Sequence, residues 1–402
     1  MLKILQICNK APFPADDGSS IAIYNMAQGL IANDVKLRVL AINTKKHFKP
    51  DSGVDPAFRS ASAYSSVFRN TDISWFGAFC NMFSSQSYFV TRFYFRAFEK
   101  QLIELIEAEN FDIVQLEGLF MGVYIDTIRK HSRAKVVLRA HNIEHYIWKR
   151  HISNKTNWFT RVYLSLQNSR LKKFELRVFS KLDAVVPISE TDALEIKNLG
   201  CNLPVFTCIS GVSVRDYQAR NNQPVKNKTI FYFGSMDWLP NQEAVTWFLQ
   251  HCWDTIHQQD PEARLIIAGR GMPLHFFHIT RPNVSIVENV PDAASFYRQH
   301  QIMIVPLLSG SGLRIKIIEG MAYGKAIVST TVGAEGIKCT HEKNILIADT
   351  PDAFAAAVLR LLKNESERQQ IEQAAAAFAS TEFDNSKVVG ALTGFYKTLV
   401  HG

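Results

Sequence analysis

The stretch from Pro306 to Ser329 combines residue types that suit the binding of a phosphate group. A short apolar run leads into a loop that includes Ser311 and Gly312, and a helix is predicted directly after it. Backbone N–H groups at a helix N-terminus attract anions. Arg314 and Lys316 lie in the first turn, where a cation opposes the helix dipole and costs ~0.3–1 kcal/mol. A bound phosphate would reverse that cost, so the loop, the helix end and the two cations predict a phosphate site.

Glu319 follows one helical turn later and extends the predicted site toward a nucleotide. A carboxylate there can accept hydrogen bonds from two hydroxyls, as a ribose diol would offer. An alternative is that Lys316 and Glu319 form an i,i+3 ion pair on an exposed helix face. The chain has no GxGxxG after its first predicted strand and no GxxxxGK[ST], so neither a dinucleotide oxidoreductase nor a P-loop NTPase is supported.

These residues belong to the second of two alternations of short apolar runs and amphipathic stretches. Strands separated by helices predict parallel sheets covered on both faces. A polar, basic segment over 213–229 suggests a linker, and we expect an N-terminal domain over 1–208, a C-terminal domain over 209–385 and a last helix over 386–402. Ligands of such sheets bind beyond the carboxyl ends of the strands. The expected strands are Lys3–Cys8, Leu37–Ile42, Ile113–Leu116, Val136–Arg139, Ala184–Ile188, Thr229–Phe233, Leu265–Ala268, Val284–Val287, Ile302–Leu307 and Ala326–Ser329.

The positive charge of the chain is concentrated in one segment. The 402 residues carry a formal net charge of +8. Residues 145–181 hold nine lysines and arginines and only one acidic residue, Glu175, so this segment accounts for the whole excess. It indicates an anionic partner, either lipid headgroups or phosphates, or simply a solvated helix face. The preceding segment 75–98 is rich in aromatic residues, which suit core packing or a membrane interface.

Other classes of protein find less support. The six cysteines form no CxxC pair, which favours reduced thiols and a cytoplasmic protein. No run approaches the ~20 apolar residues that span a bilayer, so any membrane contact is expected to be peripheral. The local charge excess comes without an RNA-binding motif, so a nucleic-acid partner is not expected.

The stretch that holds Arg314, Lys316 and Glu319 resembles the C-domain signature of retaining glycosyltransferases of family 4 (glycosyl transferases group 1), which have the GT-B fold. In that family a Gly-x-Gly-x-Arg-x-Lys-x-x-Glu run opens the helix that holds the nucleotide sugar. Glu319 matches the second Glu of the family's Glu-x7-Glu motif. The first Glu would fall at Ser311, where loop amides near Gly312 are implied to hold the sugar hydroxyls instead.

The resemblance extends over nearly the whole chain. The loop from Ala11 to Gly18 is similar to the glycine loop near the donor phosphates, and Ile209–Val212 to an interdomain element. Ala140–Glu144 is similar to the histidine loop near the transferred sugar. Phe233–Asn241, which includes Gly234, resembles the first C-domain loop of a subset linked to exopolysaccharide clusters. Most of the family has Gly-Arg with a nearby Lys in that loop.

In this sequence Ser235 replaces that Arg, and the nearby Lys is missing. Arg314 and Lys316 are then expected to supply the charge that binds the diphosphate. Asp237 in the same loop either contacts substrate or caps a helix that begins near Pro240.

The resemblance implies an α/β GT-B fold, with two Rossmann-like domains facing each other across a cleft and the C-terminal helix returning to the N-domain. It implies a hexosyltransferase-like enzyme that moves a sugar from a nucleoside diphosphate sugar to a glycan or lipid-linked acceptor. The anomeric configuration would be retained, no metal would be needed, and the pathway would be surface polysaccharide synthesis at the inner face of the cytoplasmic membrane. Peripheral contact with anionic lipid would run through 145–181.

Roles for single residues follow from the same resemblance. Catalytic roles fall to His141, which would contact a hydroxyl of the donor sugar or acceptor, and to Arg314 and Lys316, which would stabilise the leaving diphosphate. Asn142 and Glu144 are candidates for acceptor binding or for local turn structure. The candidate donor-binding residues are Gly18, Gly234, Ser311, Gly312, Arg314, Lys316 and Glu319.

Two alternatives stay open. The same fold serves sugar-nucleotide epimerases and phosphorylases. The missing first Glu and the missing Gly-Arg pair also fit a catalytically degenerate GT-B scaffold that binds a nucleotide, a glycan or a protein partner.

Overall fold

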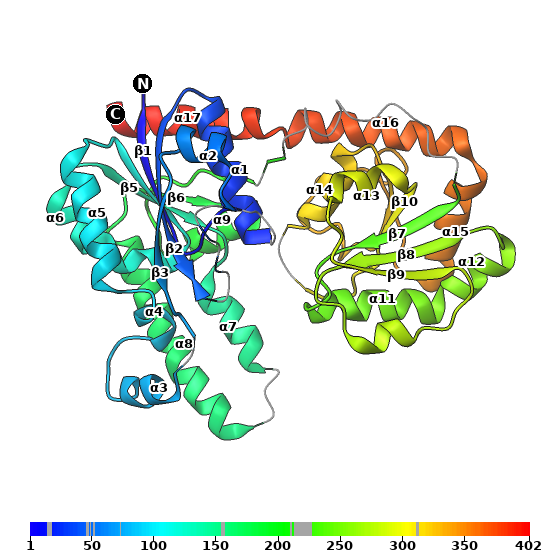
Figure 1. The fold of residues 1–402 in the computed structure, drawn as a ribbon, viewed down its shortest axis with the longest axis horizontal. Coiled ribbons are helices and arrows are strands. Elements are labelled where there is room, and N and C mark those ends of the chain that lie inside the picture. Colours follow the sequence, from blue (N-terminus) through cyan, green and yellow to red (C-terminus); the bar gives the residue numbers. More distant parts are fainter. Residues whose placement is uncertain are drawn as a thin grey trace. The chain divides into compact units, whose positions relative to one another are not determined.

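The chain divides into two compact units in the computed structural model (Figure 1). Unit 1 comprises Met1–Gly211 and Ser386–Gly402, and unit 2 comprises Val212–Asn385. Most of the segment expected to link them, 213–226, lies outside the described residues. The structure describes residues 1–13, 18–45, 48, 50, 53–72, 74–153, 157–209, 211–212, 227–310 and 313–402.

Unit 1 is built on a parallel six-stranded sheet of order β3-β2-β1-β4-β5-β6. The chain moves outward from β1 through β2 and β3, then returns beside β1 and moves outward the other way. The direction of winding therefore reverses between β1 and β4, and ligands of doubly wound sheets bind at the carboxyl edge beside such a point. The strands are β1 (Lys3–Cys8), β2 (Lys36–Thr44), β3 (Ser65–Arg69), β4 (Ile113–Glu117), β5 (Lys135–Ala140) and β6 (Ala184–Pro187).

Helices cover both faces of this sheet because successive side chains of a buried strand point to opposite sides. Leu5 packs into the core beneath α5, α6 and α8, whereas Ile4 packs into the core beneath α1 and α17. The helices of unit 1 are α1 (Gly18–Ala32), α2 (Pro56–Ala61), α3 (Trp75–Asn81), α4 (Tyr88–Thr91), α5 (Arg96–Ala108), η3 (Leu119–Tyr124), α6 (Ile125–His131), α7 (Glu144–Ser153), α8 (Trp158–Phe179), α9 (Glu190–Asn198) and α17 (Asn385–His401).

The C-terminal helix α17 packs on the N-terminal unit, as the sequence predicts. Its residues Val389, Leu392 and Tyr396 are buried in the same core as Ile4 and Ile23. Without α17, part of this face of the sheet would be open to water, so the last 17 residues of the chain complete the core of unit 1.

Unit 2 repeats the same architecture, with strand order β12-β11-β10-β7-β8-β9 and parallel pairing throughout the described strands. The winding reverses between β7 and β10, which places the loops after these two strands at the candidate ligand edge. The strands are β7 (Thr229–Phe233), β8 (Arg264–Gly269), β9 (Val284–Glu288), β10 (Ile302–Val305), β11 (Ala326–Ser329) and β12 (Leu346–Ile347). The helices are α11 (Leu239–His251), α12 (Trp253–Gln259), η4 (Leu274–His278), α13 (Ala293–Gln299), α14 (Ile315–Ala322), α15 (Pro351–Lys363) and α16 (Glu365–Glu382).

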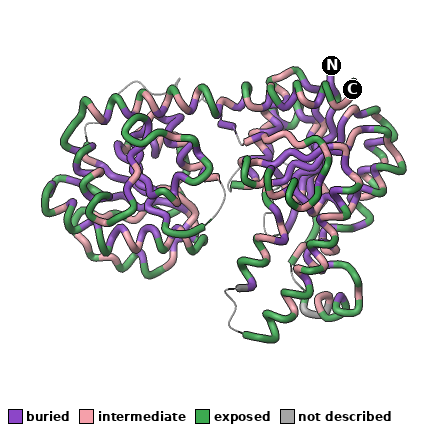
Figure 2. The backbone as a smooth tube through the Cα atoms, turned by 180° about the vertical axis from the view of Figure 1, so that it is seen from behind, coloured by how far each residue is buried: buried purple, intermediate pink, exposed green. Residues whose placement is uncertain are grey.

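The strands form the buried centre of each unit, and the outer faces of the helices are exposed (Figure 2). The predicted α/β fold class is confirmed. Two edge strands, β3 and β12, escaped the sequence analysis: the first is only partly buried and the second is two residues long. In the described part of the chain, no helix combines the length and the apolar character needed to cross a bilayer.

Candidate functional site

Lys316 bonds to β7 and to the helix after it, across the switch point of unit 2. It lies in the first turn of α14, which follows β10. Its Nζ donates hydrogen bonds to the Tyr232 hydroxyl at 2.9 Å and to Asn241 Oδ1 at 3.0 Å, and it lies 4.6 Å from the centre of the Tyr232 ring. A Cβ on Gly234 would come within 2.6 Å of Nζ, so a larger residue there would displace the ammonium group from this position.

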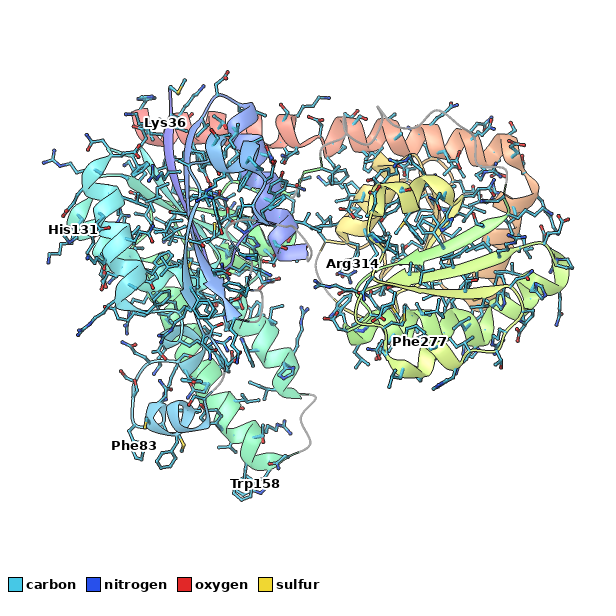
Figure 3. All side chains as sticks on the ribbon, in the orientation of Figure 1. Lys36, Phe83, His131, Trp158, Phe277 and Arg314 are labelled. Carbon is cyan, nitrogen blue, oxygen red and sulfur yellow. The ribbon has the colours of Figure 1, made fainter. Side chains whose placement is uncertain are left out.

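Arg314 precedes the helix at its N-cap position and lies at the carboxyl edge of the sheet (Figure 3). Its guanidinium carbon is 5.7 Å from the centre of the Trp238 ring, within the range of a cation–π interaction. The preceding Gly310 has φ +107°, and a Cβ there would meet Trp238 at 2.9 Å. The predicted anion ligands Ser311 and Gly312 lie outside the described residues.

Burial changes the ionisation of Lys316 and Glu319. Burial, with Arg314 nearby, lowers the pKa of Lys316 to about 7, while Glu319 opposes that shift. Burial raises the pKa of Glu319 to about 7, against the effect of Lys316. An exposed i,i+3 ion pair is therefore the wrong interpretation: both side chains are half-buried, and Lys316 bonds to Tyr232 and Asn241. An anion beside Lys316 would favour its charged form.

A further cation lies beside Ser235, the position where the related sequences are expected to have arginine. Arg270 Nε donates to Ser235 Oγ at 3.0 Å, and Ser235 Oγ donates to Asp237 Oδ1 at 2.7 Å. Arg270 comes directly after β8, so the sheet brings it next to the loop after β7. Arg270 was not among the residues predicted from sequence, although Gly-Arg-Gly after a predicted strand is a usable signal. The helix-cap interpretation of Asp237 is wrong, because α11 has Trp238 at its N-cap.

The candidate residue of unit 1, His141, is held by a buried carboxylate. His141 follows β5, and its Nε2 lies 2.7 Å from Glu117 Oε2 at the end of β4. Arg139 Nη1 donates to the same oxygen at 3.2 Å. Gln6 and Gln115 donate to Glu117 Oε1 at 2.7 and 2.5 Å. Both oxygens of a fully buried carboxylate are thus engaged by donors from β1, β4, β5 and the residue after β5.

Burial favours the neutral form of His141, and the hydrogen bond to Glu117 fixes its tautomer. Burial alone would raise the pKa of Glu117, but Arg139 and the hydrogen bonds from His141 and Gln6 lower it to about 2. Burial lowers the pKa of His141, Arg139 adds to that effect, and Glu117 opposes it. A neutral imidazole that donates from Nε2 keeps the lone pair on Nδ1, which can accept a hydrogen bond from a hydroxyl.

The network around Glu117 also reaches the C-terminal helix. The Tyr396 hydroxyl of α17 donates to Gln115 Oε1 at 2.6 Å. Neither Glu117 nor Tyr396 was predicted from the sequence motifs. A carboxylate at the end of a buried strand was the one available signal for Glu117, since buried charges in proteins are paired.

Glu144, the candidate acceptor ligand, begins α7 next to a second buried carboxylate. Glu175 of α8 accepts the backbone N–H groups of Glu144 at 3.1 Å and of His145 at 3.3 Å, and it lies 2.5 Å from His145 Nδ1. Burial, and secondarily Glu175, raises the pKa of Glu144 to about 8. At neutral pH its carboxyl group is therefore largely protonated and can donate a hydrogen bond.

The structure thus groups the candidates within each unit. Gly234, Arg314, Lys316 and Glu319 converge at the carboxyl edge of the unit 2 sheet. His141 and Asn142 lie in the loop after β5, and Glu144 begins the helix that follows. The Asn142 side chain is exposed. Gly18 is the first residue of α1, where a Cβ would meet nothing within 4 Å. Within the described ranges, no three His, Cys, Asp or Glu side chains are grouped to hold a metal ion.

Residues 227–364 match the family described as glycosyl transferases group 1. The match covers most of unit 2. The family resemblance that the sequence motifs indicate is therefore confirmed. A stretch of 281 residues is also 22% identical to an uncharacterized 44.6 kDa protein in the cps region of Klebsiella pneumoniae, covering 67% of this chain and 71% of that protein.

Solved glycosyltransferase structures share the fold of the whole chain. HepE of Anabaena, crystallised with UDP, is 13% identical with a TM-score of 0.67, covering 99% of this chain and 100% of HepE. Sucrose-phosphate synthase of Thermosynechococcus elongatus is 14% identical with a TM-score of 0.70, covering 99% of each chain. At these identities the likeness shows the fold alone, which is GT-B.

Proposed function

We propose that this chain is a retaining glycosyltransferase that moves a hexose from a nucleoside diphosphate sugar to a glycan or lipid-linked acceptor in surface polysaccharide synthesis. The observation that carries the proposal is the placement of Lys316. A half-buried ammonium group is held at the switch point of a doubly wound sheet, one residue into a helix and close to a glycine loop. The group 1 match over this unit and the cps-region relative support the same class.

On the donor side, Arg314, Lys316 and the amides of the loop that holds Ser311 and Gly312 bind the diphosphate, and Glu319 binds the ribose. Gly18 and Gly234 let the backbone approach the phosphates. HepE is crystallised with UDP and with UDP-glucose, which makes a uridine nucleotide the first to test.

The chemistry then depends on stabilising a departing diphosphate. Negative charge grows on the leaving group in the transition state, and cations fixed beforehand in a water-poor site stabilise that charge most effectively. In this proposal the leaving phosphate oxygen takes the acceptor proton, so no strong base and no metal is required. His141 accepts a sugar or acceptor hydroxyl through Nδ1. Asn142 and the protonated Glu144 offer hydrogen-bond donors to the acceptor.

The donor site is tested by thermal unfolding with UDP, GDP, ADP, dTDP and CMP. A ligand at 100 times its Kd raises the free energy of unfolding by ~2.7 kcal/mol. We expect one diphosphate to stabilise the wild type but neither Arg314→Ala nor Glu319→Ala. Lys363→Ala, which removes an exposed cation of α15, should respond like the wild type. Product analysis with nucleotide sugars that carry the stabilising nucleotide then measures sugar transfer and the anomeric configuration of the product.

A catalytically degenerate scaffold is the second candidate, because Ser311 and Ser235 replace acidic and basic residues of the related motifs. Binding of a nucleotide without turnover of any of its sugar derivatives would favour the scaffold. Failure of every nucleotide to stabilise the protein would overturn the donor site itself.

We further propose that the enzyme works in the cytoplasm as a peripheral membrane protein, through the tip formed by α3 and the start of α8. Phe79, Phe83, Trp158 and Phe159 are between 58% and 84% exposed, and the labelled rings of Phe83 and Trp158 lie at the outer end of these helices (Figure 3). The end of α3 docks on α8, where Arg170 donates to two backbone carbonyls at 3.0 Å. Aromatic side chains next to a basic helix are typical of a membrane interface.

Replacing Phe83, Trp158 and Phe159 with serine is expected to lower binding to phosphatidylglycerol vesicles by about 10-fold or more, because each buried apolar side chain contributes about 1.5–3 kcal/mol when fully transferred. Vesicle co-sedimentation at low salt measures this. Leu274→Ser, which removes an 80% exposed side chain of η4, is the control and should bind like the wild type. Wild-type protein that ignores anionic vesicles would contradict the proposal.

A further inference from the structure

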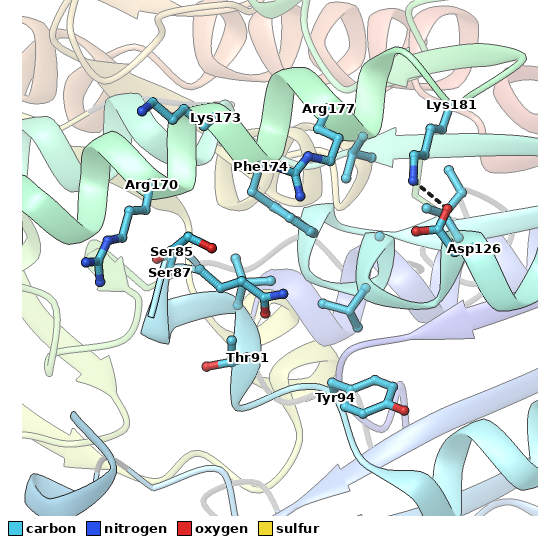
Figure 4. A pocket seen from close by; sticks show the side chains of 16 residues that line it. Ser85, Ser87, Thr91, Tyr94, Asp126, Arg170, Lys173, Phe174, Arg177 and Lys181 are labelled. Atoms are coloured by element: carbon cyan, nitrogen blue, oxygen red, sulfur yellow. Dashed lines mark hydrogen bonds and ion pairs between the residues drawn. The ribbon is translucent and has the colours of Figure 1, made fainter. Parts of the chain in front are cut away.

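We propose that a pocket beside α8 in unit 1 is a second anion site, which binds a phosphate-bearing ligand independently of the nucleotide. The pocket has a volume of about 730 Å³. Its wall on the α8 side carries four cations, Arg170, Lys173, Arg177 and Lys181 (Figure 4). Spacings of three, four and four residues place them along one face of the helical segment and its end.

The two central cations have no internal role. Lys173 and Arg177 are exposed, and within the described part of the chain neither side chain makes a hydrogen bond or ion pair. Arg170 is fixed by the carbonyls at the end of α3, and Lys181 pairs with Asp126 at the start of α6. Asp126 is the only carboxylate among the described lining residues, so the pocket has a clear excess of positive charge.

The opposite wall offers hydroxyl groups, one of which is buried without a partner. Ser85, Ser87, Thr91 and Tyr94 line the pocket from α4 and its flanking loops. Ser87 is 1% exposed, and its Oγ has no hydrogen bond among the described residues. It occupies the N-cap position of α4 without capping the helix through its side chain. A buried hydroxyl without a partner is unfavourable, and a ligand oxygen in the pocket would relieve that cost.

The chemistry of the lining indicates a phosphate with an organic group attached. Arginine and lysine together bind phosphate oxygens through charge-assisted hydrogen bonds. Val90, Phe174 and Val178 form apolar parts of the same lining, which an ion alone would leave unused. A volume of about 730 Å³ also lies in the range of pockets for small organic molecules. The phosphate can belong to a lipid headgroup or to a soluble phosphate ester, and the experiment separates the two.

The experiment compares two double variants that remove the same charge from unit 1. Lys173→Ala with Arg177→Ala removes the two central cations of the pocket wall, while Lys130→Ala with Arg133→Ala removes two exposed cations at the end of α6 that neither line the pocket nor belong to the basic segment 145–181. All measurements use the Lys316→Met background, which removes the main diphosphate ligand of unit 2. Pyrophosphate binding is measured by calorimetry, and binding to phosphatidylglycerol vesicles is measured by co-sedimentation.

We expect the pocket variant to bind about 10-fold more weakly or worse, and the control to stay within about twofold of its parent. A loss in the pyrophosphate arm identifies a soluble phosphate ester, and a loss confined to the vesicle arm identifies a lipid headgroup. Ser87→Ala should weaken binding of the same ligand without any change of charge. Equal losses in both double variants would overturn the pocket in favour of a general charge effect, and so would the absence of binding in both arms.

Discussion

Replacing Lys316 with methionine is expected to lower kcat for sugar transfer by about 10²–10³-fold, which is the usual cost of removing one group that stabilises developing negative charge. Methionine keeps much of the length and apolar volume of lysine but carries no charge. The hydrogen bonds to Tyr232 and Asn241 hold the ammonium group in place before the donor arrives, so its electrostatic effect needs no rearrangement. Steady-state kinetics with the active nucleotide sugar measure the change. An unchanged kcat with a raised KM would mean that Lys316 binds the ground state and the transition state equally and does not accelerate the chemical step.

The ionisation of Lys316 gives this prediction a second readout. Its pKa of about 7 means that at pH 8 the group is mostly neutral in the free protein. A bound diphosphate favours the charged form and raises that pKa, so binding at pH 8 should take up close to one proton. Calorimetry in buffers of different ionisation enthalpy counts the protons. The Lys316→Met protein should take up none, while Lys363→Met should behave like the wild type.

Glu319 must be separated from Lys316 in this experiment, because its raised pKa also lies near 7. At pH 8 the carboxyl group is mostly ionised already, and a ribose diol that donates to it would keep it so. Glu319→Gln should therefore weaken nucleotide binding but leave the proton uptake. Loss of the uptake in this variant alone would assign the titration to the carboxylate and contradict the role of the lysine.

The site of unit 2 could be predicted from sequence because its parts are neighbours along the chain. A strand, a glycine-rich loop and a helix that begins with cations lie within about 15 residues, and each has a local signature. Tyr232 and Asn241 were not identified because they reach Lys316 across 84 and 75 residues of sequence. Arg270 was missed for the same reason, since only the pairing of β7 with β8 brings it beside Ser235.

The aromatic segment shows where composition alone stops being informative. Phe89, Phe93 and Phe98 are buried in the core of unit 1, whereas Phe79 and Phe83 are exposed. All of them lie within 20 residues and have the same chemistry. What separates them is the docking of α4 against α8 and η3, a tertiary contact that leaves the end of α3 outside the core. Sequence patterns therefore predicted both a core and a membrane surface without dividing the residues between them.

Glu117 is the clearest case of a candidate site residue whose partners only the fold reveals. Its partners Gln6 and Arg139 come from separate strands, and the donor that fixes Gln115 comes from Tyr396 at the other end of the chain. No local pattern encodes such an arrangement. The parallel order β1-β4-β5 places these side chains side by side at the carboxyl edge. His141 is thereby positioned by a network that the last helix of the chain completes.

Replacing Glu117 with glutamine is expected to reduce the free energy of unfolding by about 3–5 kcal/mol, because it leaves the buried charge of Arg139 without its counter-ion. The NH₂ group of the new glutamine would also face another donor in either orientation. It would meet Gln6 and Gln115 on one side, or Arg139 and His141 on the other. Urea unfolding at pH 7 measures the loss. Glu104→Gln is the matched control, since Glu104 forms an exposed pair with Lys100 and should change stability by less than about 1 kcal/mol.

The free energy of unfolding measured at acid pH tests the same carboxylate without mutation of its partners. The pKa of Glu117 is lowered to about 2 in the folded protein, below its ordinary value of 4.5. Its contribution to the free energy of unfolding is therefore complete above about pH 4.5. That contribution is lost as the pH falls from about 4.5 toward 2. Glu117→Gln should remove this part of the acid dependence and Glu104→Gln should keep it.

In addition, kcat should fall more than KM rises in the glutamine variant, with partial recovery in Glu117→Asp, if the carboxylate positions His141. A variant that loses stability but keeps the wild-type kcat would limit Glu117 to the folding of unit 1, because a misoriented His141 could not leave the chemical step unchanged.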